Sequence, residues 1–121
     1  MDSQEKIVEK YWKLIKLEGQ NIKMADNQER EVYFRLKSDD QSIIGFAGCN
    51  TMSGKHELME GNRIKFSKIG VTMRLCPDVD VNESEFLKVF ELADNYSIHN
   101  DKLSLNIGKR APLAVFEAVY F

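Results

Sequence analysis

Apolar and polar residues alternate along much of this chain with the two-residue period of β-strands. Between residues 31 and 36 every second residue is apolar, beginning at Val32, and the side chains between them face the opposite way. Short segments of similar character, separated by turn-forming residues, occur at residues 11–17, 42–47, 63–67, 96–98 and 103–105. The pattern therefore predicts a series of short strands rather than a helical protein.

One segment has the period of a helix instead. Its apolar stripe repeats at intervals of three and four residues and consists of Phe86, Val89, Phe90 and Ala93. Asn82 is a suitable N-cap, and Glu85 three residues later completes the spacing of a capping box. We therefore expect a helix over residues 83–94, with the stripe buried and with Lys88 and Glu91 exposed.

Two tight turns and an apolar final segment complete the pattern. Gly61-Asn62 and Asn100-Asp101 are typical of two-residue hairpin turns, because these residue types tolerate positive φ. Residues 113–121 are apolar on both faces except at Glu117, which is typical of a central strand or of one covered on both faces. Together the elements predict a mainly β (α+β) fold, an antiparallel barrel-like sheet of about eight short strands with one α-helix near residues 83–94.

Composition narrows the class of protein. The chain has 121 residues, enough for one domain with its own core, and it is 43% hydrophobic and 30% charged, which excludes a disordered chain. Seventeen basic against 19 acidic residues give a net charge of -2 without a basic stripe, so no nucleic-acid partner is expected. No apolar run reaches the ~20 residues of a membrane span. Residues 1–10 are polar without the apolar region of a signal peptide; we assign them to an N-terminal tail and residues 11–121 to the domain.

The most distinctive segment is nearly bare of side chains on one face. On a strand, Gly45, Ala47 and Cys49 would point the same way, so another group must approach this backbone closely. Packing against the helix or at a barrel corner is the favoured interpretation, and close approach of a ligand is the alternative. No Gly-x-Gly-x-x-Gly or Gly-Lys-Ser/Thr motif is present, so a phosphate-binding loop is not predicted.

The chain offers little for thiol chemistry. Cys49 and Cys76 lie in different segments, and a reactive thiol needs a histidine or a second cysteine close by. His99 precedes a turn, and His56 lies in a Lys-His-Glu stretch that we expect to be solvated. We therefore predict no catalytic residue, and either buried free thiols or a mutual disulfide.

Metal binding is not predicted either. Asp78, Asp80 and Asn82 mimic the start of a calcium loop, but the twelfth position is Val89 rather than a bidentate glutamate. Acidic residues ahead of a helix N-terminus explain the pattern through the helix dipole. The expectation is no metal and no cofactor.

Several motifs in this order resemble the META domain family, that of the HslJ-like bacterial heat-shock proteins. They are Trp12-Lys13-Leu14, Gly19, the Gly-Cys-Asn segment 45–50 with Gly54, Thr72-Met73-Arg74-Leu75-Cys76, Glu85-Phe86-Leu87 and Leu103-Ser104-Leu105. The resemblance covers about residues 11–120. The most specific matches, which we expect to be structural, are Gly45, Gly48, Cys49, Asn50, Gly54, Thr72, Met73 and Cys76.

The resemblance implies a compact antiparallel barrel-like sheet with one helix and no known enzymatic activity. It implies a stress-associated protein of the bacterial envelope, periplasmic or anchored at the outer membrane; a lipid anchor in the precursor and a cytoplasmic location stay open. We expect a monomer that binds a protein partner or a small ligand. The alternative is a thiol-redox protein or enzyme that uses Cys49 and Cys76.

The two cysteine-bearing motifs are expected to meet in the fold. Cys49 ends the bare strand, and Cys76 points opposite to the large apolar residues of its own segment. Both therefore lie at the edge of a small-residue surface where another backbone comes near. We predict that the two cysteines are neighbours, joined in an oxidising compartment and reduced in a reducing one.

Overall fold

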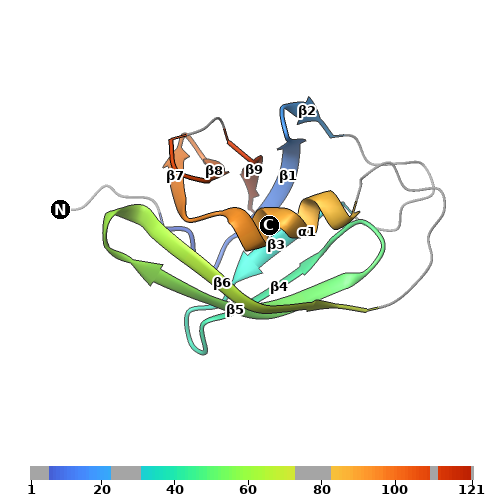
Figure 1. Cartoon of the computed structure of the whole chain (residues 1–121), viewed down its shortest axis with the longest axis horizontal. Coiled ribbons are helices and arrows are strands. Elements are labelled where there is room, and N and C mark those ends of the chain that lie inside the picture. The colour runs from blue at the N-terminus through green and yellow to red at the C-terminus, as the bar shows by residue number, and fades with distance from the viewer. Residues whose placement is uncertain (1–5, 23–30, 73–82, 110–111, 121) are drawn as a thin grey trace.

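Nine strands and one α-helix make up the described part of the chain (Figure 1). The computed structural model describes residues 6–22, 31–72, 83–109 and 112–120. In chain order the elements are β1 (Tyr11–Leu17), β2 (Gln20–Asn21), β3 (Tyr33–Leu36), β4 (Ser42–Phe46), β5 (Thr51–Met59), a 3₁₀ turn (Glu60–Asn62), β6 (Arg63–Val71), α1 (Glu83–Leu92), β7 (Asn95–His99), β8 (Lys102–Asn106) and β9 (Ala114–Val119).

The strands form one antiparallel sheet that closes into a ring. Their order is β2-β1-β3-β4-β5-β6-β7-β8-β9, and β9 pairs with β1 to complete the circuit. The predicted mainly β, barrel-like sheet with one helix is therefore confirmed. The apolar segment near the C-terminus is a central strand, as predicted, because β9 is hydrogen-bonded to β1 on one side and to β8 on the other.

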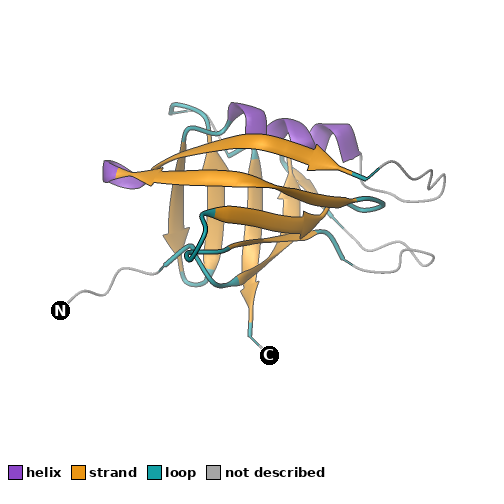
Figure 2. Ribbon diagram, turned by 90° about the horizontal axis from the view of Figure 1, so that it is seen from below, coloured by secondary structure: helices purple, strands orange, loops and turns teal. Residues whose placement is uncertain are grey.

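The predicted turn residues adopt the left-handed backbone that their types favour. Asn100 and Asp101 have φ values of 53° and 63° and join the paired residues His99 and Lys102. Gly61 and Asn62 have φ values of 72° and 60°, but their loop also contains Glu60 and is one residue longer than predicted. The longest hairpin, β5–β6, extends beyond the neighbouring strands in Figure 2.

Helix α1 lies against the inner side of the sheet, between the β5–β6 hairpin and strands β7–β9 (Figure 1). It begins at Glu83 as predicted and ends at Leu92, two residues earlier than expected. Strands β6 and β7 share a single register pair, Arg63 with Asn95, so the helix covers the interior where these strands separate. Within the described ranges, no helix has the length and apolar character needed to cross a membrane.

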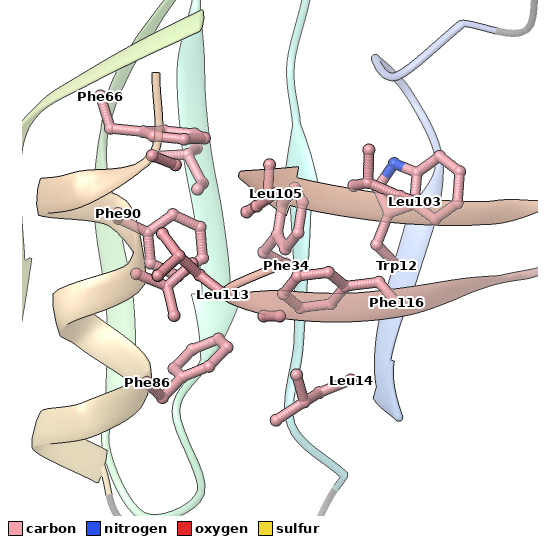
Figure 3. Close-up of a cluster of buried hydrophobic side chains, with 14 of the residues drawn as sticks. Trp12, Leu14, Phe34, Phe66, Phe86, Phe90, Leu103, Leu105, Leu113 and Phe116 are labelled. Carbon is pink, nitrogen blue, oxygen red and sulfur yellow. The ribbon is translucent and has the colours of Figure 1, made fainter. Parts of the chain in front are cut away.

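The core is built around the helix stripe and is rich in aromatic rings. Phe86 and Phe90 project from α1 toward the sheet in Figure 3, while Lys88 and Glu91 are exposed, as predicted. The Phe90 ring meets the ring of Phe34 edge-to-face at 5.5 Å between centroids. Further edge-to-face pairs join Phe66, Phe86 and Phe116 to the same cluster. Such contacts add specificity to apolar burial, which supplies most of the stabilisation.

Residues ahead of β1 also pack on the barrel. Ile7 is 2% exposed, and its carbonyl accepts a hydrogen bond from Trp12 Nε1 at 2.8 Å. The backbone N–H of Glu9 donates to the carbonyl of Leu36 at 2.7 Å. The segment assigned to a tail is thus in contact with the domain from Ile7 onward, because its apolar side chain and backbone groups find partners there.

Candidate functional site

The bare segment is enclosed in the fold, with every residue from Gly45 to Asn50 buried. A Cβ atom at Gly45 would lie 2.5 Å from the carbonyl oxygen of Tyr33 and 3.0 Å from Cε of Met52. Ala47 is fully buried as well. The missing side chain therefore allows strands β3 and β4 to pack closely, so the close approach is made by the neighbouring strand and Met52 rather than by the helix. The backbone of Gly45 also forms part of an open groove on the outer face.

A cluster of directional hydrogen bonds, here called the polar corner, consists of Cys49, Asn50, Thr72 and Glu83. The Glu83 carboxylate accepts hydrogen bonds from the backbone N–H groups of Cys49 (3.3 Å) and Asn50 (2.8 Å). It also accepts one from Asn50 Nδ2 at 2.8 Å. The Thr72 hydroxyl donates to Asn50 Oδ1 at 2.9 Å and accepts from the backbone N–H of Thr51 at 3.1 Å. The polar corner thus joins the first residue of α1 to the start of β5 and the end of β6.

Two glycines of the family motif allow this local geometry. Gly48 has a φ of 114°, a conformation that side chains rarely adopt, and it turns the chain toward Asn50. A Cβ at Gly54 would lie 2.7 Å from Cδ1 of Ile69 and 3.0 Å from the carbonyl oxygen of Ser67, where the β5–β6 register shifts. Gly48 is therefore favoured by its backbone conformation, and Gly54 by the close approach of Ile69 and Ser67 of β6.

Cys49 is 6% exposed and is disulfide-bonded rather than free. Several residues singled out in the sequence lie outside the described ranges, namely Met73, Cys76, Asp78, Asp80 and Asn82. The predicted proximity of Cys49 and Cys76 therefore stays a prediction. In the ranges that are described, no three His, Cys, Asp or Glu side chains are grouped as metal ligands.

An open groove of about 570 Å³ crosses the outer face of β4, β5 and β6, with Tyr33 of β3 at one end. Ile44, Ser53 and Gly70 are neighbours across these three strands in the register of the sheet. The groove has free space above Gly70, since a Cβ atom added there would have no other heavy atom within 4 Å. Ile44 beside it is 41% exposed.

The groove is apolar with a few hydroxyl groups. Its other lining residues include Thr51, Val71 and Thr72, and every residue that lines it is uncharged. Thr72 belongs to both the groove and the polar corner, so the wall of the groove is held in place by the hydrogen bonds at Asn50. The arrangement suits an uncharged, largely apolar ligand surface.

His56 is buried, and the prediction that it is solvated is wrong. The residue is 5% exposed, and its backbone N–H donates to the carbonyl of Gln41 at 2.8 Å. Its ring Nδ1 lies 3.1 Å from the carbonyl oxygen of Ser42. The flanking charges suggested solvent, but on a strand they face the opposite side from His56. Burial lowers the pKa of His56 below its ordinary value, against smaller opposing effects of the Ser42 carbonyl and Asp40.

Sequence reasoning did not identify the groove residues as a group. Ile43 is buried, so the side chain of Ile44, the next residue of the strand, faces outward. An outward-facing isoleucine is the feature of the sequence that could have indicated an apolar surface here. Its pairing with Ser53 and Gly70 depends on strand register, which the sequence does not state. His99 is exposed at the end of β7, directly before the turn.

Comparison with known proteins supports a family but not an activity. An NMR structure of a protein from Burkholderia xenovorans matches with a TM-score of 0.71 and 18% identity, covering 93% of this chain and 83% of that one, which shows a shared fold. No curated protein matches. The model of the META domain family matches residues 5–120, nearly the whole chain. The chain therefore belongs to the META domain family.

Proposed function

We propose that this chain is a non-catalytic, stress-associated domain of the bacterial envelope that binds an extended, apolar segment of a partner protein in the groove over β4–β6. The observation that carries the proposal is the groove itself, with exposed Ile44 beside the hollow at Gly70. Neighbouring strands lie about 4.8 Å apart, so a groove crossing three strands accommodates roughly three residues of extended chain.

The chemistry of the groove favours binding over catalysis. Acid–base and nucleophilic catalysis use histidine, carboxylate, lysine or cysteine side chains, and every residue that lines this groove is uncharged. An open, apolar surface with hydroxyl groups instead suits side chains and peptide groups of a partner. The groove is too open to enclose most of a small ligand, which is why a protein segment is the favoured occupant.

The state of Cys49 supports an envelope location. Structural disulfides persist in oxidising compartments such as the periplasm, and Cys49 is disulfide-bonded. The polar corner also argues against the thiol-redox alternative, because the Glu83 carboxylate accepts a hydrogen bond from the backbone of Cys49. A carboxylate this close disfavours a thiolate, the form that reacts.

Site-specific photo-crosslinking in bacterial cells that express the chain tests the proposal. A photoreactive residue at Ser53, exposed in the groove, is expected to give a discrete adduct with an envelope protein, mapped by mass spectrometry to an extended apolar segment. Gly70→Leu should abolish the adduct by filling the groove, since the position has free space. The matched controls are a photoreactive residue at exposed Ser97 of β7 and the substitution Ser97→Leu. Identical adducts from both positions, or none from Ser53, would overturn it.

A further inference from the structure

The register of the sheet fixes the distance between the two apolar features of the groove. Ile44, Ser53 and Gly70 are neighbours across β4, β5 and β6, so Ile44 and the hollow at Gly70 are two strand spacings apart. Neighbouring strands lie about 4.8 Å apart, which places these two features about 9.6 Å from each other. A segment that lies along this row of residues therefore makes its apolar contacts at that interval.

This interval distinguishes between two extended conformations of a bound chain. Side chains of a β-strand return to the same side at every second residue, after about 6.6 Å. Side chains of a polyproline II helix return after three residues, or about 9.3 Å. One turn of polyproline II thus spans the distance from Ile44 to the hollow at Gly70, whereas the side chains of a β-strand do not match it.

The backbone of the strands beneath the groove is committed to the sheet. β4 is hydrogen-bonded to β3 and β5, and β5 is hydrogen-bonded to β4 and β6, so a ligand finds its polar partners among side chains. Within the described ranges, the hydroxyl groups of Tyr33, Thr51 and Ser53 form no hydrogen bond with another residue. These hydroxyls can donate to the carbonyl oxygens of a ligand. Proline keeps its carbonyl oxygen but has no N–H that would need an acceptor.

An aromatic ring stands at the β3 end of the groove in a fixed orientation. Tyr33 lies opposite Phe46, and Phe46 and Ile44 are two residues apart on β4, so Tyr33 and Ile44 face the same side of the sheet. The Tyr33 ring stacks on the Tyr11 ring, with 4.3 Å between their centroids and 11° between their planes. The Tyr11 hydroxyl in turn donates to Glu31 at 3.0 Å. Aromatic rings held in grooves are the surfaces on which proline-rich segments dock.

We propose that the segment bound in the groove is proline-rich and adopts the polyproline II conformation. Its apolar side chains, three positions apart, contact Ile44 and fill the hollow at Gly70, and a proline packs on Tyr33. This inference rests on the proposed function and names the chemistry of the partner segment. Every residue that lines the groove is uncharged, and a segment of prolines and apolar residues brings no charge to it. The conformation also exists before binding, so an open surface binds it at a smaller entropic cost.

Fluorescence anisotropy with two labelled, uncharged peptides of equal length tests the proposal on the full chain. The first peptide repeats Leu-Pro-Pro, which places leucine at every third position of polyproline II. The second repeats Val-Thr, which favours the β conformation. We expect saturable binding of the Leu-Pro-Pro peptide, at least about tenfold tighter than that of the Val-Thr peptide. Equal or tighter binding of the Val-Thr peptide would overturn the inference.

Variants at Tyr33 test the aromatic contact. Tyr33→Ala is expected to weaken binding of the Leu-Pro-Pro peptide about tenfold, because the ring is lost. Tyr33→Phe keeps the ring and should retain most of the affinity, and circular dichroism verifies that both variants are folded. The matched control is Tyr120→Ala, at an exposed tyrosine outside the groove. Equal losses in Tyr33→Ala and Tyr120→Ala, or no loss in either, would contradict the contact of proline with Tyr33.

The remaining outcomes separate this inference from the proposed function. Gly70→Leu fills the hollow and should abolish binding of the Leu-Pro-Pro peptide, and unchanged binding would place the peptide elsewhere and overturn the inference. A crosslinked partner at Ser53 whose segment lacks proline would overturn the polyproline II assignment but leave the binding of a protein segment intact. Absence of both the adduct and peptide binding would overturn the two proposals together.

Discussion

Helix α1 is held at two regions by different kinds of interaction. Along its length, the aromatic core packs Phe86 and Phe90 against rings from the sheet, and the contacts are edge-to-face and apolar. At its first residue, the polar corner holds Glu83 by hydrogen bonds from Cys49 and Asn50. Apolar packing tolerates exchange among side chains of similar volume, whereas each hydrogen bond of the corner requires one donor and one acceptor in place. Three of the distinctive residues of the chain, Cys49, Asn50 and Thr72, lie in the second region.

The largest effect is expected in the aromatic core. Phe90 is 1% exposed, and Phe90→Ala removes a ring that contacts three other rings, so unfolding should become easier by about 3–5 kcal/mol. Chemical denaturation followed by circular dichroism measures the change. Glu91→Ala, on the exposed side of the same helix, is the control. A loss below about 1 kcal/mol in Phe90→Ala would mean that the core is not the main anchor of α1.

Reduction of the disulfide at Cys49 tests how much this covalent bond adds to the stability that the hydrogen bonds of the polar corner provide. For a Cys49–Cys76 bond, loop entropy predicts a loss of about 3–4 kcal/mol on reduction. Denaturation with and without reductant measures this loss, and peptide mapping of the non-reduced monomer checks the pairing. A disulfide that joins two chains, or an unchanged stability after reduction, would contradict the predicted pairing.

A pair of glycine substitutions compares close packing inside the sheet with the open groove outside it. Gly45→Val places a Cβ 2.5 Å from the carbonyl oxygen of Tyr33, so we expect a loss of about 1–3 kcal/mol by overpacking. Gly70→Val adds the same side chain where no other atom lies within 4 Å, and its stability should stay within about 0.5 kcal/mol of the original. Thermal denaturation of both variants measures the two losses of stability. Equal losses would show that Gly45 is not specifically crowded.

Substitution of Asn50 should weaken the polar corner by less than Phe90→Ala weakens the core. Asn50→Ala removes hydrogen bonds to Glu83 and Thr72 at a position that is 4% exposed, at an expected cost of about 1–3 kcal/mol. A double-mutant cycle with Glu83→Ala isolates the pair, and a coupling of at least about 0.5 kcal/mol is expected. Additive effects would mean that the corner is not a cooperative unit.

The smallest expected effect is the dependence of stability on pH. It tests the burial of His56, which lies outside both the aromatic core and the polar corner. Its pKa in the folded state is lowered by burial, so the unfolded chain binds a proton first as the pH falls through the ordinary value of 6.5. Stability should therefore decrease on acidification below about pH 6.5 and recover above it. Melting temperatures from pH 7.5 to 5.5 measure the slope. His56→Gln, which keeps a donor for the Ser42 carbonyl, should flatten it; an unchanged slope would assign the effect to other groups.

The regular elements were largely predictable because their periodicity is a local property. The stripe from Phe86 to Ala93 identified the helix and its buried face, and alternation identified the strands. The turn at Asn100-Asp101 followed from residue types that adopt positive φ. The candidate site was less predictable. Ile44 and Gly70 are 26 positions apart in the chain and become neighbours only through Ser53 and the register of β4, β5 and β6.

His56 illustrates the limit of local patterns. Charged neighbours in the sequence predicted exposure, yet the ring is buried against the Ser42 carbonyl. By itself, the sequence determined the mainly β class, the single helix with its buried face, the turn positions and the family motif, since each depends on residues close together in the chain. Only the tertiary structure decided which strands are neighbours, that Asn50 binds Glu83, and where the groove lies. Those features depend on strand register and ring closure, which bring together residues far apart in the sequence.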